Sequence, residues 1–258
     1  MRAAIIGGTG FDRLTAFDLK LETITTPYGD VPLYLGQREA EDLVFLPRHG
    51  PDHTVPPHRI NYRANIKALE ILDVGRALAT FAVGSLHLDI APGSLVVLDQ
   101  FLDFTKGREG TFFDGGASGL VHTLVTNPYC PALREQLMTA ASKHDLTLVP
   151  KGTYACTNGP RFETPAEVRM LAQLGGDVVG MTGVPEAPLA RELGIHYAAV
   201  ALSINWGAGL VDEEVEIVRG LETKKKALIA LFVDVLHQKP HGACACEKSN
   251  LVVHPPTA

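Results

Sequence analysis

Several features are missing from the 258-residue chain, and each absence excludes a class of protein. No run of 18 uncharged apolar residues occurs, so the sequence predicts no membrane-spanning helix. The net charge is −6 and long basic runs are absent, which argues against a nucleic-acid partner. The first residues pass directly into an apolar run at 3–6, without the pattern of a signal peptide. We therefore expect a cytoplasmic protein that binds neither membrane nor nucleic acid.

Cysteine is also scarce, with four residues in the whole chain. Cys130 and Cys156 lie far apart and are typical of ordinary reduced thiols. Cys244 and Cys246 are separated by one alanine, and only His241 lies close as a further nitrogen ligand. Because a metal site needs more ligands at suitable spacing, no metal ion is predicted. The motif is compatible with a strained disulfide or with no special role, and the second interpretation is favoured.

The residues that are present indicate an α/β protein. Hydrophobic residues make up 46% of the chain and charged residues 20%, enough for a sizeable core. Short apolar runs predict strands, and stretches of helical periodicity lie between many of them, which implies a single domain with a mixed, largely parallel sheet flanked by helices. We expect this domain at 1–240, a C-terminal tail at 241–258 and a long polar loop at 105–119. The predicted strands are 3–6, 31–35, 43–46, 77–83, 94–98, 146–149, 152–156, 178–180 and 197–204, and the predicted helices are 61–72, 131–144, 165–174, 186–193 and 214–236.

A glycine-rich turn at 7–10 follows the first predicted strand. Glycines let a backbone approach a ligand closely, and Thr9 adds a hydroxyl group, so the turn suits an anion. A dinucleotide fingerprint is the competing interpretation, but Arg13 occupies the position of its third glycine. Taken alone, the turn is weak evidence for either site.

Three further segments at predicted strand ends carry anion-binding groups. Arg48 offers a planar fork that matches phosphate oxygens, and His49 adds a second donor. Thr182 offers a hydroxyl group, and Ala82 lies near a strand end where backbone N–H groups are free. Each residue alone is as well explained by a salt bridge or by packing. Because ligands of α/β sheets bind at the carboxyl ends of strands, the four segments together predict an anion site.

Seven short segments, taken together and in order, resemble the trimeric purine nucleoside phosphorylases, and most of all their 5′-methylthioadenosine phosphorylase branch. The resemblance runs from about residue 3 to about residue 235. It implies the nucleoside phosphorylase fold and a pentosyltransferase of purine salvage that converts a nucleoside and phosphate into a free base and a sugar 1-phosphate. Phosphate is then a co-substrate, and no cofactor is implied. The segments are 7–10, 48–50, 61–65, 84–85, 99–101, 159–162 and 181–186.

The same resemblance implies roles for individual residues. Met181 would lie against the ribose, Phe162 would stack near the base, and Asn205 would face the base edge. His122 matches a position that reaches into the 5′ pocket of a neighbouring subunit, so the resemblance implies a homotrimer or a dimer of trimers. The implied phosphate ligands are Thr9, Arg48, His49, the backbone of Phe81 and Ala82, and Thr182.

Asn205 departs from the methylthioadenosine branch, whose members carry aspartate there and a second aspartate at the position of Gly207. An amide can donate to a 6-oxo group and accept from N7–H, but it has no acidic proton for an adenine leaving group. A flipped amide could still bind adenine. The expected substrates are therefore 6-oxopurine nucleosides, and Asn205 is the predicted catalytic residue. Glu163 is compatible with a hydrogen bond to the purine and with a structural role.

The 5′ substituent is less constrained by the sequence. Ile217 and Val218, near the start of the predicted final helix, are expected to line this pocket together with His122. Apolar side chains suit a methylthio group, as in methylthioinosine, whereas His122 could hold the hydroxyl of inosine or guanosine. Packing on a helix face explains Ile217 and Val218 equally well. The Cys-Ala-Cys tail is similar to a tail of some thermostable family members in which the two cysteines can pair.

Three rival functions are weighed against a 6-oxopurine nucleoside phosphorylase. A methylthioadenosine phosphorylase of methionine salvage is the alternative within the family, and Asn205 argues against it. A nucleoside hydrolase would use water, and the phosphate ligands implied by the resemblance argue against that. A nucleoside-binding protein would bind nucleosides without cleaving them, so stabilisation by a nucleoside without turnover would identify it.

Overall fold

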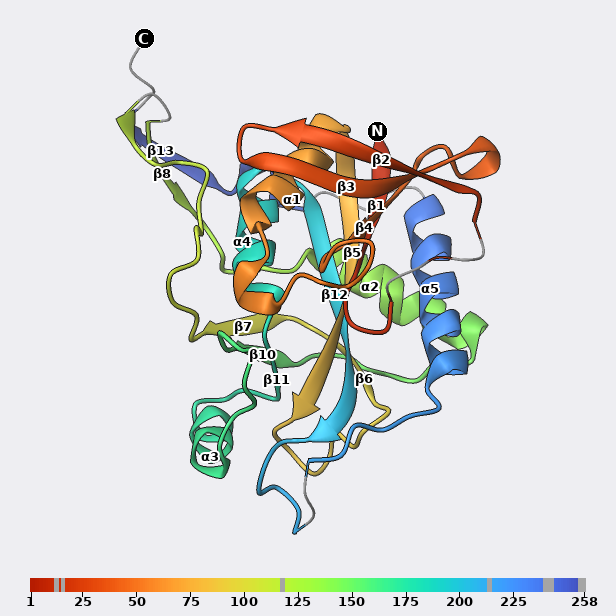
Figure 1. Cartoon of the computed structure of the whole chain (residues 1–258), viewed down its shortest axis with the longest axis vertical. Helices are drawn as coiled ribbons and strands as arrows, with labels where there is room; N and C mark the ends of the chain where they lie inside the picture. Colours follow the sequence, from red (N-terminus) through yellow and green to blue (C-terminus); the bar gives the residue numbers. More distant parts are fainter. Residues whose placement is uncertain (12–13, 15–16, 117–118, 213–214, 239–243, 255–258) are drawn as a thin grey trace.

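The computed structural model describes residues 1–258 except 12–13, 15–16, 117–118, 213–214, 239–243 and 255–258. Eleven of the described strands form one mixed sheet with helices on both faces (Figure 1). The predicted single α/β domain with a largely parallel sheet is confirmed. The predicted boundary between residues 240 and 241 lies outside the described part of the chain. Within that part, no helix combines the length and the apolar character that crossing a membrane requires.

Three long strands form the centre of the sheet: β1 (Arg2–Gly7), β5 (Val74–Ser85) and β12 (His196–Trp206). β5 lies between the other two and pairs in parallel with both. Their residues are nearly all buried, because helices cover both faces of the sheet. Burial on both faces explains why these segments read as continuous apolar runs instead of alternating patterns.

The other strands extend this centre on three sides. β4 (Leu43–Pro47) pairs in parallel with β1 and leads to the antiparallel β3 (Gly29–Gly36) and β2 (Leu19–Thr26). β11 (Val178–Gly180) pairs with the last residues of β5 and leads to β10 (Thr153–Cys156) and β7 (Gln100–Asp103). β6 (Leu95–Val97) joins β12 to β9 (Leu148–Val149). β8 (Leu120–Thr123) and β13 (Asn250–His254) form a separate antiparallel ribbon.

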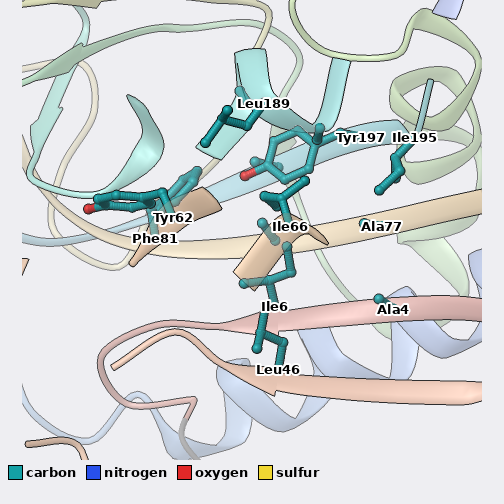
Figure 2. Close-up of a cluster of buried hydrophobic side chains, with 14 of the residues drawn as sticks. Ala4, Ile6, Leu46, Tyr62, Ile66, Ala77, Phe81, Leu189, Ile195 and Tyr197 are labelled. Carbon is teal, nitrogen blue, oxygen red and sulfur yellow. The ribbon is translucent and has the colours of Figure 1, made fainter. Parts of the chain in front are cut away.

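Two pairs of helices enclose the centre of the sheet. α1 (Tyr62–Ile71) and α4 (Gly183–Glu192) pack together over one hydrophobic cluster. Figure 2 shows part of this cluster, in which Ile66 of α1 and Leu189 of α4 lie among side chains of the sheet such as Tyr197. α2 (Pro131–Ala140) and α5 (Glu222–His237) pack together over a second cluster. α3 (Pro165–Gln173) lies apart from both pairs (Figure 1). Short 3-10 helices occupy Arg38–Ala40, Pro57–Arg59, Ala141–His144 and Cys246–Lys248.

Helix starts follow capping signals in the sequence. The Asn61 side chain accepts a hydrogen bond from the Ala64 N–H at the start of α1. Thr164 and Glu167 form a reciprocal capping box at the start of α3, where Arg161 also donates to Glu167. Such caps satisfy backbone N–H groups that have no partner within the helix.

The predicted element boundaries needed correction in several places. The helix expected over 214–236 begins at Glu222, because the residues before it, which include Gly220 at φ 78°, have no helical conformation; Glu214 itself is not among the described residues. The helix expected over 131–144 ends at Ala140 and continues as a 3-10 turn up to the left-handed Asp145. β2, β7, β8 and β13 were not predicted.

The strand register brings four chain segments to one edge of the sheet. Gly7 at the end of β1 lies beside Pro47 at the end of β4. Near the ends of β5 and β12, Gly84 lies beside Asn205 after a register shift in β12. The carboxyl ends of these parallel strands therefore frame one location, as expected for a ligand site in an α/β sheet.

Candidate active site

A cavity of about 210 Å³ lies at this edge of the sheet. It is lined by all but two of the residues that the sequence predicts for the site. The exceptions are His122 and Val218. The predicted residues that line the cavity are Thr9, Arg48, His49, Phe81, Ala82, Phe162, Glu163, Met181, Thr182, Asn205, Gly207 and Ile217.

Arg48 forms the most deeply buried charged group of the cavity wall. Its Nε donates to Glu186 Oε2 at 2.6 Å, its Nη2 donates to Glu186 Oε1 at 2.7 Å, and its Nη1 donates to the Thr80 carbonyl at 3.0 Å. Burial alone would lower the pKa of Arg48, but the contacts with Glu186 outweigh it and raise the pKa above its ordinary value. An arginine has five N–H groups, so these contacts leave two for a ligand.

Glu186 was not predicted as a site residue, although it is the buried partner that holds Arg48. Its Oε1 also accepts a hydrogen bond from the Tyr197 hydroxyl at 2.7 Å. Burial raises the pKa of Tyr197 well above its ordinary value, and the nearby Glu186 carboxylate adds to the shift, so this hydroxyl keeps its proton. The sequence carried one signal, a glutamate in an apolar stretch of α4 with no cation three or four residues away. A buried carboxylate of this kind usually pairs with a cation, which can come from a distant part of the sequence.

Close packing around the cavity accounts for several of its glycines. A Cβ atom at Gly8 would lie 2.6 Å from Arg48 Nη1, so only glycine lets the first turn approach the guanidinium. A Cβ atom at Gly180 would lie 2.4 Å from the Tyr154 hydroxyl oxygen, and one at Gly183 would lie 2.8 Å from the Tyr154 ring. The glycines that flank residues 181–182 therefore make room for Tyr154.

His49 and Thr182 both line the cavity, and each is held by a hydrogen bond within the chain. His49 Nδ1 lies 2.8 Å from the Val55 carbonyl, and this nitrogen carries a proton because a carbonyl can only accept. The Thr182 N–H donates to the Tyr154 hydroxyl at 3.0 Å. Both side chains are buried and have fixed backbones at the cavity surface.

Asn205 is buried, and its amide orientation is set by one contact. Its Nδ2 donates to the Trp206 carbonyl at 2.7 Å, and because this carbonyl cannot donate, the flipped amide would lose this hydrogen bond. Oδ1 has no hydrogen-bond partner among the described residues. A Cβ atom at Gly84 would lie 3.1 Å from Nδ2, and one at Gly207 would lie 2.7 Å from the Ser85 carbonyl. The cavity thus contains one acceptor and one remaining N–H from the same amide.

The outer wall of the cavity is more open. Phe162 is 54% exposed and Ile217 is 49% exposed. Glu163 Oε1 accepts a hydrogen bond from the Thr157 hydroxyl at 2.7 Å, so this carboxylate already has a partner in the chain. Met181 packs so closely against Gly159 that a Cβ atom there would lie 2.5 Å from its sulfur.

Val218 and His122 lie outside the cavity. Val218 donates its N–H to the Ile204 carbonyl at 2.7 Å and lines a neighbouring hollow together with Trp206 and Ile217. His122 is exposed on β8, opposite Leu251 of β13. The ribbon of β8 and β13 projects from the body of the domain near the C-terminal end of the chain (Figure 1).

Arg108 is a second residue that the sequence analysis missed. The segment 105–115 has neither helix nor strand, as expected for the predicted loop. Arg108 nevertheless inserts into the domain, donating to the carbonyls of Val184, Asn158 and Met181 and lying over the Tyr62 ring. This side chain ties the loop to the backbone on which Met181 and Thr182 sit.

The chain is similar to known proteins over most of its length. The profile of the Phosphorylase superfamily matches residues 2–236. A relative from Moorella thermoacetica named "Probable 6-oxopurine nucleoside phosphorylase" is 52% identical over 95% of this chain and 96% of its own. Methanopyrus kandleri has a relative named "Probable S-methyl-5′-thioinosine phosphorylase", 44% identical over 95% and 96%. A structure of a mutant adenosine/methylthioadenosine phosphorylase from Schistosoma mansoni with adenine has a TM-score of 0.85 at 34% identity, covering 91% of this chain and 90% of that one.

Proposed function

Because this chain belongs to the Phosphorylase superfamily, we propose that it cleaves 6-oxopurine nucleosides with inorganic phosphate, as a pentosyltransferase of purine salvage. Relatives named for 6-oxopurine nucleosides are 43% to 52% identical, two named for methylthioinosine are 44% and 43% identical, and one named for methylthioadenosine is 41% identical. The higher identities of several 6-oxopurine relatives support a 6-oxopurine substrate.

The observation that carries the proposal is the fixed amide of Asn205. Its Nδ2 is held by the Trp206 carbonyl, so one N–H and Oδ1 remain to meet a base. The N–H can donate to a 6-oxo group while Oδ1 accepts from N7–H. A neutral amide has no proton to give to an adenine leaving group. Asn205 is therefore assigned to the catalytic position at the base edge.

Arg48, His49, Thr9 and Thr182 are assigned to phosphate in this proposal. Phosphate would attack C1′ of the ribose as the bond from C1′ to N9 breaks, and the electron pair of that bond passes to the base. The new bond joins a phosphate oxygen to C1′. The negative charge on the base spreads to O6, where the Asn205 N–H stabilises it. N7 takes up a proton from solvent, and the hydrogen phosphate releases its own proton to solvent as it becomes the sugar phosphate, so that the protons balance. Positioning and electrostatic stabilisation suffice for such a displacement.

A homo-oligomer, a trimer or a dimer of trimers, is part of the same proposal. Six apolar side chains are exposed on or beside the β8–β13 ribbon, and clusters of this kind mark association surfaces. His122 lies on the same ribbon and would reach the 5′ end of a nucleoside held by another chain. Light scattering after size exclusion tests the oligomeric state. The apolar residues are Leu120, Leu124, Val125, Leu251, Val252 and Val253.

The experiment that tests the function measures base release from five nucleosides, with and without phosphate. Inosine, guanosine and methylthioinosine are the 6-oxo substrates, and adenosine and methylthioadenosine are their 6-amino counterparts. We expect phosphate-dependent release from the 6-oxo substrates only. The rate ratio of methylthioinosine to inosine assigns the 5′ group, for which the apolar Val215 and Ile217 at the cavity mouth favour methylthio.

Each rival function predicts a different result in this assay. Strong cleavage of methylthioadenosine would identify a methylthioadenosine phosphorylase and show that another residue supplies the acid. Release without phosphate would identify a hydrolase. Thermal stabilisation by nucleosides without any turnover would identify a binding protein.

A further inference from the structure

Four potential metal ligands converge on the side of the domain that α2 and α5 cover. Cys130 precedes α2, His196 is the first residue of β12, and Cys244 and Cys246 belong to the C-terminal segment. The three sulfur atoms and His196 Nδ1 all lie within 4.8 Å of one another. None of the four residues lines the cavity of the candidate active site. The cluster is therefore a separate feature of the molecule.

Two of the distances within the cluster are those expected for tetrahedral coordination, and the others lie within about 1 Å of them. Zinc binds sulfur at about 2.3 Å and nitrogen at about 2.0–2.1 Å, which places neighbouring tetrahedral ligands roughly 3.5–3.8 Å apart. The sulfur atoms of Cys130 and Cys244 are 3.7 Å apart, and His196 Nδ1 lies 3.6 Å from Cys130 Sγ and 3.1 Å from Cys244 Sγ. All four cysteines of the chain are free thiols, so no disulfide occupies the cluster. A sulfur–sulfur bond would need a separation of about 2.0 Å.

Contacts around the cluster orient the ligands as in known zinc sites. His196 directs Nδ1 at the sulfur atoms, while its Nε2 lies 3.4 Å from the Glu247 carboxylate. A carboxylate in this place fixes the ring orientation and makes the ligating nitrogen more basic. Arg191 Nη1 donates to Cys246 Sγ at 3.1 Å, and the Cys246 N–H donates to Cys244 Sγ at 3.4 Å. Three thiolates around a divalent ion leave one negative charge, which the buried Arg191 balances.

We propose that Cys130, His196, Cys244 and Cys246 bind one structural zinc ion. Four protein ligands close the coordination sphere, which is the arrangement of structural zinc sites, whereas catalytic sites keep an open position. The ion would tie the C-terminal segment to the starts of α2 and β12. The Cys-Ala-Cys motif alone did not predict this site, because the other two ligands lie far away in the sequence.

The first test is the metal content of untagged protein grown with zinc and purified without chelator. Mass spectrometry of the metal should find about one zinc per chain, and the intact denatured protein should have the mass of four reduced cysteines. After replacement of zinc by cobalt, the spectrum should show thiolate-to-metal charge transfer and the intense ligand-field bands of a tetrahedral site. A mass two hydrogens lower would reveal a disulfide and overturn the proposal. So would four free thiols without metal.

Variants locate the ion. Cys246→Ser should lose the bound zinc, whereas Cys156→Ser, which changes the one cysteine outside the cluster, should keep it. Glu247→Ala should weaken zinc binding by roughly tenfold to a hundredfold in competition with a colorimetric chelator. Glu135→Ala, an equally solvated glutamate on α2, is its control and should leave the affinity unchanged.

The proposal can be tested even if one of these variants fails to fold. Glu247 is exposed, so its replacement should leave the fold intact and still report on the site if Cys246→Ser proves insoluble. Unchanged zinc affinity in Glu247→Ala and full zinc content in Cys246→Ser would place the metal elsewhere and contradict the proposal.

Discussion

At the floor of the cavity Arg48 is 2% exposed and has hydrogen-bond partners on three of its nitrogen atoms, whereas at the mouth Phe162 and Ile217 are each about half exposed. The floor is built by strand ends and by a carboxylate from α4, and hydrogen bonds within the chain hold Arg48 in place there. The mouth is built by the segments around Phe162 and Ile217, outside helices and strands. Preorganised donors stabilise developing charge most effectively. The chain therefore holds the groups that are proposed to bind the anion in place and leaves the side proposed for the sugar exposed.

The largest effect in this comparison should come from Glu186→Ala. Removing the carboxylate leaves Arg48 buried without a counter-ion, which costs about 3–5 kcal/mol of unfolding free energy. Urea denaturation monitored by circular dichroism measures the loss. In the double variant Arg48→Met/Glu186→Leu, much of the stability should return, since no buried charge remains. A loss below about 1 kcal/mol for Glu186→Ala would show that the floor is not held by this pair.

Arg48→Lys tests the role of the floor in binding phosphate. Lysine keeps the positive charge but cannot hold Glu186 with a planar fork and offer further N–H groups at the same time. We expect the KM for phosphate to rise by roughly tenfold to a hundredfold, the loss of one or two charge-assisted hydrogen bonds. The KM for inosine should change much less. Equal changes in both constants would place Arg48 outside the phosphate site.

Asn205→Asp tests whether a buried residue of the cavity floor sets the preference between 6-oxopurine and 6-aminopurine nucleosides. Aspartate restores a group that can carry a proton, so the preference should move toward 6-aminopurine nucleosides by roughly tenfold or more. The measurement is the ratio of kcat/KM for inosine and adenosine. An unchanged ratio would mean that this residue does not read the base.

The smallest effects should appear at the mouth. Ile217→Ser should change the unfolding free energy by no more than about 0.5 kcal/mol, because the side chain is half exposed. It should raise the KM for methylthioinosine while leaving that for phosphate unchanged. Leu174→Ser, a similarly exposed leucine at the end of α3 and outside the cavity, is the control. If both variants behave alike in the assay, the mouth residues do not contact the substrate.

The sequence was most informative where its signal is local. The buried runs of β1, β5 and β12 and the capped helices α1 and α3 were predicted with nearly correct boundaries. β2, β7, β8 and β13 were missed, and of these β2, β7 and β8 expose residues along their length and lack a continuous apolar run. The last helix was placed too early, since the apolar residues before Gly220 were read as its first turns.

The residues of the candidate site also separate into those with a local signal in the sequence and those without one. The polar residues at the ends of predicted strands meet in one cavity, because parallel strands bring their ends together. The partners that fix them could not be predicted, since Glu186 lies 138 residues from Arg48 in the sequence. Cys130 and Cys244 are likewise separated by 114 residues. Contacts over such distances depend on the complete fold, and composition or spacing does not show them.

The position of β5 also determines the order in which parts of the sheet unfold locally. The branch of β4, β3 and β2 reaches β5 only through β1, the branch of β10 and β7 only through β11, and β6 and β9 only through β12. Any branch can detach transiently while β5 keeps its other neighbours. Amides of β5 should therefore exchange with solvent only when the whole domain unfolds, and should be the slowest in native-state hydrogen exchange. The strand that supports the proposed anion site is thus expected to be the part of the molecule that opens last.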